Sequence, residues 1–165
     1  MLVLTLAAGL AHAGPLATDA TGRFVSNQTP ATVQGILADA LTRSLESLPW
    51  AFRAVARGML EEQATACPAY TMAMTETTFR VHCDGRTPYT WALEKTTPFT
   101  TPKGDTTQAT TTLSGRSVTL RFAGDDGGKA WTYTFSESGG LTVKQEVASA
   151  RLPTPMVWTL TFAKE

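Results

Sequence analysis

The second half of the chain consists of short segments in which apolar and polar residues alternate strictly. Residues 117–122, 130–136 and 156–162 each carry a large apolar side chain at every second position. Successive side chains of a β-strand point to opposite faces of a sheet, so this period of two predicts strands with one polar and one apolar face. An antiparallel meander of such strands must cover its apolar face or close around it. Whether core side chains or a ligand lie against that face is therefore the functional question.

The same pattern of strand and turn covers most of the chain. Turns such as Asp84-Gly85 and Ser114-Gly115 separate the segments, and these residue types favour hairpin turns. The strand candidates from about residue 69 onward are 70–74, 78–83, 89–94, a weaker stretch near Phe99, 106–113, 117–122, 130–136, 141–148 and 156–163. One earlier candidate, residues 22–26, lies within a segment over residues 14–30 that otherwise looks loosely structured.

Two helices are predicted before the main run of strands. Thr29 is suited to cap the first helix and Pro30 to begin it, and apolar residues recur at helical spacing over 33–48. Pro49 ends this helix, because proline disfavours the helical conformation in the residue before it, and a second helix runs to about residue 63. We expect both apolar stripes to pack in the core. The stripe of the second helix comprises Phe52, Val55, Ala56, Met59 and Leu60.

The predicted fold class is therefore α+β, with an N-terminal helical hairpin followed by an antiparallel β-meander of about eight or nine strands, as a curved sheet or a barrel. The chain has 165 residues, which predicts one domain, over residues 14–165. Lys plus Arg and Asp plus Glu are 14 each, so the formal net charge is zero. This balance argues against a nucleic-acid partner, which requires a basic surface.

The N-terminus has the pattern of an export signal. Residues 2–10 are a short apolar stretch, and Ala11-His12-Ala13 is an A-x-A cleavage pattern. The sequence thus predicts a signal peptide over residues 1–13 and a periplasmic or secreted protein. The stretch is too short to span a bilayer. No Lys or Arg precedes it, so either the true start lies upstream of Met1 or the segment is an ordinary buried N-terminus.

The two cysteines are expected to form a disulfide. Cys67 and Cys83 are the only cysteines, and an even pair in an exported protein predicts a bridge. Closing a loop of about 15 residues contributes roughly 3 kcal/mol in the chain-entropy model. The alternative is two buried free thiols. With only His82 nearby the pair is a poor zinc site, so we expect no metal and no cofactor.

Candidate residues for chemistry are few. His82 shares the polar face of its strand, with no carboxylate or serine placed beside it in sequence, so we expect a solvated residue and no enzyme. Gln145 interrupts an apolar face formed by Leu141, Val143 and Val147. An inward polar side chain needs a hydrogen-bond partner, which is either a ligand or a backbone group or buried water.

Taken in order, these elements resemble the fatty-acid-binding protein branch of the calycins. In that family a first strand carrying Gly-x-Trp leads to two short helices and then to strands that close a barrel over an internal lipid. Gly22-Arg23-Phe24 stands at the place of the first strand, with Phe in place of Trp. The family binds a fatty-acid carboxylate with Arg-x-Tyr in its last strand, where this chain has Leu160-Thr161-Phe162. Residues 130–136 also lack the family's inward arginine, so the resemblance implies a neutral apolar ligand.

The function predicted is an exported, non-enzymatic binding protein for a small hydrophobic, lipid-like ligand. The alternative is a protein-interaction or inhibitor module with a solid, lipocalin-like barrel. An internal cavity of a few hundred Å3 would distinguish the first from the second. The ligand's identity and the oligomeric state stay open. The expected ligand-lining residues are Met72, Met74, Trp91, Leu120, Trp131, Tyr133, Gln145 and Trp158.

Overall fold

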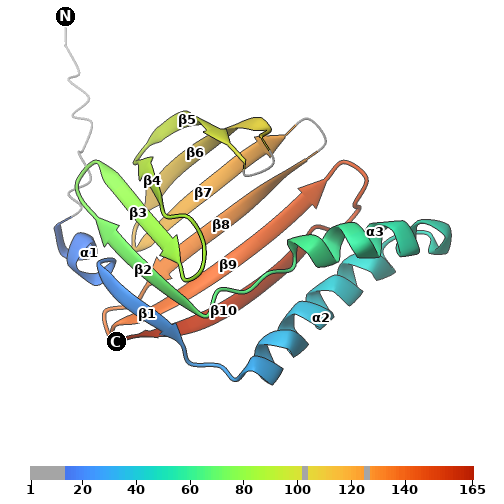
Figure 1. Ribbon diagram of the computed structural model, residues 1–165, viewed down its shortest axis with the longest axis horizontal. Coiled ribbons are helices and arrows are strands. Elements are labelled where there is room, and N and C mark those ends of the chain that lie inside the picture. Colours follow the sequence, from blue (N-terminus) through green and yellow to red (C-terminus); the bar gives the residue numbers. More distant parts are fainter. Residues whose placement is uncertain (1–13, 102–103, 125–126) are drawn as a thin grey trace, which may run out of the picture.

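The computed structural model describes residues 14–101, 104–124 and 127–165 and shows a strongly curved, antiparallel sheet with helices at one side (Figure 1). The sheet has ten described strands in the order β4-β3-β2-β1-β10-β9-β8-β7-β6-β5. The strands are β1 (Gly22–Ser26), β2 (Ala69–Met74), β3 (Thr78–Cys83), β4 (Tyr89–Ala92), β5 (Lys95–Thr100), β6 (Thr106–Ser114), β7 (Ser117–Gly124), β8 (Gly127–Phe135), β9 (Gly140–Ser149) and β10 (Met156–Lys164). The α+β fold class and the meander are thereby confirmed.

The sheet curls until its two ends nearly meet. Strand β10 pairs with both β1 and β9, which joins the N-terminal strands to the meander. The edge strands β4 and β5 approach each other across the remaining gap. The result is a nearly closed barrel, whose inner wall is the alternating apolar face predicted from the sequence.

The helical hairpin is confirmed, and a short helix α1 (Gly14–Asp19) precedes β1. Helix α2 (Pro30–Glu46) begins where expected, and the Thr29 hydroxyl accepts a hydrogen bond from the Thr32 backbone N–H at 3.2 Å. Helix α3 (Trp50–Gln63) follows directly after the break at Pro49. The predicted signal peptide, residues 1–13, lies outside the described residues.

The expected core role of the second helix is correct for only part of its stripe. Leu60 is buried and Ala56 packs against the core. Phe52, Val55 and Met59 are 63–71% exposed. Figure 1 shows the cause: the turn between α2 and α3 extends past the barrel wall, so much of α3 contacts α2 and no strand lies against its outer side.

Strands β7 and β8 are longer than the alternation over residues 117–122 and 130–136 predicted, since β7 continues to Gly124 and β8 begins at Gly127. Residues 125–126 are outside the described part of the chain. A side chain at Gly128 would place its Cβ 2.6 Å from the backbone oxygen of Phe122. Glycine is therefore needed here because two strand backbones approach closely. In the sequence, the same glycine looks like a turn residue.

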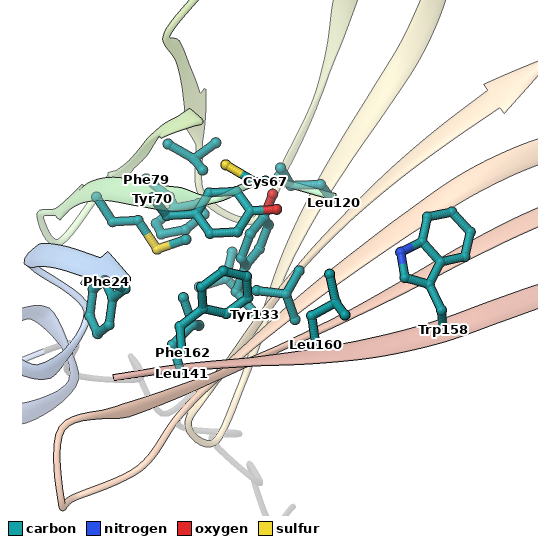
Figure 2. Packing of buried hydrophobic residues seen from close by; sticks show 14 of the residues in the cluster. Phe24, Cys67, Tyr70, Phe79, Leu120, Tyr133, Leu141, Trp158, Leu160 and Phe162 are labelled. Carbon is teal, nitrogen blue, oxygen red and sulfur yellow. The ribbon is translucent and has the colours of Figure 1, made fainter. Parts of the chain in front are cut away.

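An aromatic cluster fills one end of the barrel (Figure 2). Phe24, Phe79 and Phe162 are each at most 2% exposed. The ring centroids of Phe79 and Tyr133 are 5.4 Å apart, and those of Tyr70 and Phe162 are 5.1 Å apart in an edge-to-face arrangement. Such tilted contacts are the favoured geometry for aromatic pairs, so this end of the interior is a packed core.

Candidate functional site

A cavity of about 70 Å3 lies inside the barrel, next to the packed aromatic cluster. Its walls come from β2, β3, β4, β8 and β9, from the segment before β2 and from the turn after β3. Pockets that enclose drug-sized ligands measure about 300–1,000 Å3. The cavity is thus large enough for a small chemical group and too small for a long acyl chain.

Three of the predicted ligand-lining residues surround this cavity, namely Trp131, Tyr133 and Gln145. Four others are buried in the apolar cluster away from it; these are Met72, Met74, Trp91 and Leu120. Trp158 is also buried, and it lines a separate groove described below. All eight residues lie on the inward parity of their strands, so the alternation alone could not distinguish them in the sequence.

The predicted disulfide is present and forms part of the cavity wall. Cys67 and Cys83 are bonded, with their Cα atoms 5.7 Å apart, and both line the cavity. Cys67 lies in the segment between α3 and β2, whereas Cys83 ends β3. The bridge therefore fixes the end of the helical hairpin to the barrel wall at the cavity.

Two tyrosines place their hydroxyls at the cavity. The ring centroids of Tyr70 and Tyr133 are 5.8 Å apart in an edge-to-face arrangement, and both residues line the space. Figure 2 shows both hydroxyls at the same end of the cluster, beside Cys67. Burial raises the pKa of Tyr70 to about 12 and that of Tyr133 well above its usual value. Both hydroxyls therefore keep their protons at neutral pH.

Gln145 lies at the centre of a row of inward side chains. It is paired across the sheet with Trp131 on β8 and with Trp158 on β10. Only 7% of Gln145 is exposed. The inward orientation predicted from the parity of β9 is therefore confirmed, and two tryptophans flank the amide.

Sequence reasoning missed six residues that line the cavity, namely Thr65, Tyr70, Val81, Arg86, Thr87 and Tyr89. Tyr70 has the same parity as Met72 and Met74 on β2, so the alternation could have identified it. Arg86 follows the turn Asp84-Gly85, where no periodicity applies. It is exposed to solvent while it borders the cavity, so it stands at the rim.

A second, larger depression lies at the rim of the barrel between α2 and β10. It measures about 560 Å3 and is open to solvent. Ile36, Ala40 and Arg43 of α2 form one side, and Pro155 and Trp158 lie on the other. Trp158 is the cross-strand neighbour of Gln145, which lines the inner cavity.

His82 is half-buried on β3 and does not border the cavity. Within the described residues, no cluster of three or more His, Cys, Asp or Glu side chains could hold a metal ion. Within that same part of the chain, no helix has the length and apolar character needed to cross a bilayer.

Comparison with known proteins bears on the fold. No protein-family model and no curated protein matches this chain significantly. Solved structures do match. One is the REP1-NXSQ fatty acid transporter, 12% identical with a TM-score of 0.54, covering 90% of this chain and 98% of that chain. This chain has a calycin-like barrel fold.

Two further calycin-like barrels are similar at comparable distance. Lipid binding protein 8 of Caenorhabditis elegans is 9% identical with a TM-score of 0.54, covering 90% of this chain and 96% of that chain. Fatty-acid-binding protein 1 of Echinococcus granulosus is 11% identical with a TM-score of 0.53, covering 89% of this chain and 98% of that chain. At these identities the likeness establishes the barrel, and the side chains inside it must supply the argument about function.

Proposed function

We propose that this protein is an exported, non-enzymatic binding protein for a small hydrophobic, lipid-like ligand. The observation that carries the proposal is the partly open cavity in the barrel, lined by Tyr70, Val81, Trp131 and Tyr133. Aromatic and aliphatic walls with a few polar groups are typical of small-molecule pockets. The similar solved structures include a fatty acid transporter and a lipid binding protein, which supports the same class of ligand.

The size of the cavity limits how such a ligand would bind. A space of about 70 Å3 holds one end of a ligand, so the remainder must extend toward the rim. A second, open groove of about 560 Å3 lies at the rim between α2 and β10. Trp158, which lines it, is the cross-strand neighbour of Gln145 at the cavity.

A titration with the neutral fluorescent probe N-phenyl-1-naphthylamine tests this proposal. We expect saturable binding by the intact protein. Val81→Phe should abolish it, because the larger side chain fills the cavity. The matched control is Thr71→Phe, which adds the same ring at an exposed position on the outer face of β2 and should leave binding unchanged. Equal binding by both variants, each shown to be folded by circular dichroism, would exclude the cavity as the site.

Export is the second part of the proposal, and it rests on the apolar stretch and the A-x-A pattern before Gly14. Expression of the chain in a host that secretes proteins, followed by intact-mass measurement, tests it. We expect a mature protein that begins at Gly14, recovered outside the cytoplasm. Recovery of the uncleaved chain from the cytoplasm alone would contradict this part and leave ligand binding unaffected.

The second candidate function is a protein-interaction or inhibitor module with a solid barrel. The observation that favours it is the small cavity, which is well below the size of most ligand pockets. The same titration discriminates between the two, because a solid barrel would not bind the probe saturably.

A further inference from the structure

Three polar side chains that line the cavity make no side-chain hydrogen bond within the described part of the chain. Tyr70, Tyr133 and Gln145 are 5%, 2% and 7% exposed. In the described residues the fully buried side-chain polar atoms without a partner belong to Trp91 and Trp158, so the polar atoms of these three residues keep some accessible surface. Unpaired polar groups on the wall of a pocket are the groups that orient a ligand. All three border the same space, so one ligand group placed there could pair with each.

A fourth donor lies next to this set. The indole N–H of Trp158 is buried without an acceptor. Trp158 is the cross-strand neighbour of Gln145 and lines the rim groove. In the described residues the indole N–H of Trp91 is also buried without an acceptor, and it lies in the apolar cluster away from the cavity.

The buried polar groups at the cavity are all neutral. The two phenols keep their protons, because burial raises the pKa of both, and the amide of Gln145 carries no charge. Arg86 is the cation that borders the space, and it is exposed. Solvent and salt screen an exposed charge, whereas a buried carboxylate needs a close, equally buried partner. This arrangement disfavours an acidic head group.

We infer that the ligand's head group is neutral and both donates and accepts hydrogen bonds, in the simplest case an alcohol, and that Gln145, Tyr133 and Tyr70 bind it. An alcohol oxygen can accept a hydrogen bond from a phenol O–H, and the alcohol O–H can donate one to the carbonyl oxygen of Gln145. A carboxylate has only acceptors and would leave that oxygen unpaired. The inference rests on the proposed ligand-binding function and specifies the chemistry of the same cavity.

Three eight-carbon probes that share a chain length test the inference by displacement of N-phenyl-1-naphthylamine at pH 8. They are octan-1-ol, octanoate and octane. We expect octan-1-ol to bind at least about tenfold more tightly than either of the others, the effect of roughly one net hydrogen bond. Arg86→Gln should not change the affinity for octan-1-ol.

Two variants locate the effect. Gln145→Leu should lower the affinity for octan-1-ol about tenfold and leave the affinity for octane unchanged. Tyr133→Phe, which removes only one oxygen, should also lower the affinity for octan-1-ol selectively. It keeps the test valid if Gln145→Leu does not fold. Tighter binding of octanoate, lost in Arg86→Gln, would overturn the inference in favour of an acidic ligand. Equal binding of all three probes would overturn it while the proposed function stands. If no probe binds, the proposed function fails and the inference with it.

Discussion

The two ends of the barrel interior are built from the same strands but differ in chemistry. At the packed end, Phe24, Phe79 and Phe162 leave no polar atom and almost no exposed surface. At the cavity end, Tyr133 and Gln145 leave polar atoms without partners. Tyr133 joins the two, because its ring packs against Phe79 while the residue also lines the cavity. The packed end therefore contributes more to the stability of the fold, whereas the cavity end holds the polar groups of the candidate ligand-binding site.

The largest effect expected from this difference is at Phe79. Phe79→Ala should lower the free energy of unfolding by about 3–5 kcal/mol, because it removes a fully buried ring and leaves a cavity among close-packed neighbours. Urea denaturation followed by circular dichroism measures it. Arg80→Ala, on the exposed face of the same strand, should stay within about 0.5 kcal/mol. A loss below about 1 kcal/mol at Phe79 would mean that this end is not tightly packed.

The disulfide gives the next effect, at the boundary between cavity and helices. The double change Cys67→Ser with Cys83→Ser should lower the free energy of unfolding by about 3 kcal/mol, since the open chain regains the entropy of a loop of about 15 residues. Urea denaturation of the variant and of the oxidised protein gives the difference. We also expect the helices to become easier to cleave by protease, because the bridge fixes the segment after α3 to β3. Unchanged stability would contradict a structural role for the bridge.

The packed end could be predicted from the sequence more fully than the cavity end. Period-two alternation located the strands, and Cys83, which lies on the same face of β3 as Phe79 and Val81, lines the cavity with its partner Cys67. Alternation is a local property that burial of one face imposes on each strand. It does not report how far apart two inner faces lie, so it could not separate Leu120 in the core from Trp131 at the cavity.

The helices show the same limit. The stripes of α2 and α3 have the same spacing, yet α2 lies along β10 while Phe52, Val55 and Met59 of α3 remain exposed. Where a helix ends relative to the barrel depends on the geometry of the turn at Pro49 and on the length of α2. Arg86 was missed for a related reason, because it lies in a turn, where side-chain direction follows no repeat.

A pH titration examines the cavity end directly. Burial raises the pKa of Tyr70 from 10 to about 12, so the folded protein holds this proton more tightly than the unfolded chain does. The associated stability is fully present below pH 10 and is lost as the pH rises toward 12. The part of the loss that comes from Tyr70 should reach at most about 3 kcal/mol, and Tyr133, whose pKa burial also raises, adds to the total. Denaturation series at each pH measure the loss, and Tyr70→Phe should reduce it by the part that comes from Tyr70. An unaltered alkaline loss in that variant would place its source elsewhere.

The smallest effect expected is a gain. Gln145→Leu should raise the free energy of unfolding of the ligand-free protein by up to about 1 kcal/mol or leave it unchanged, because an apolar side chain of similar size replaces an unpaired buried amide. Leu141→Gln, on the same strand and face, is the matched reverse change and should cost about 3 kcal/mol at the packed end, where no space exists for a partner. Urea denaturation measures both. Should Gln145→Leu instead cost more than about 1 kcal/mol, the amide must already be paired within the protein. The cavity end would then have no unpaired amide to distinguish it from the packed end. Gln145, on which the inference of a neutral head group depends most, would not be free to bind a ligand.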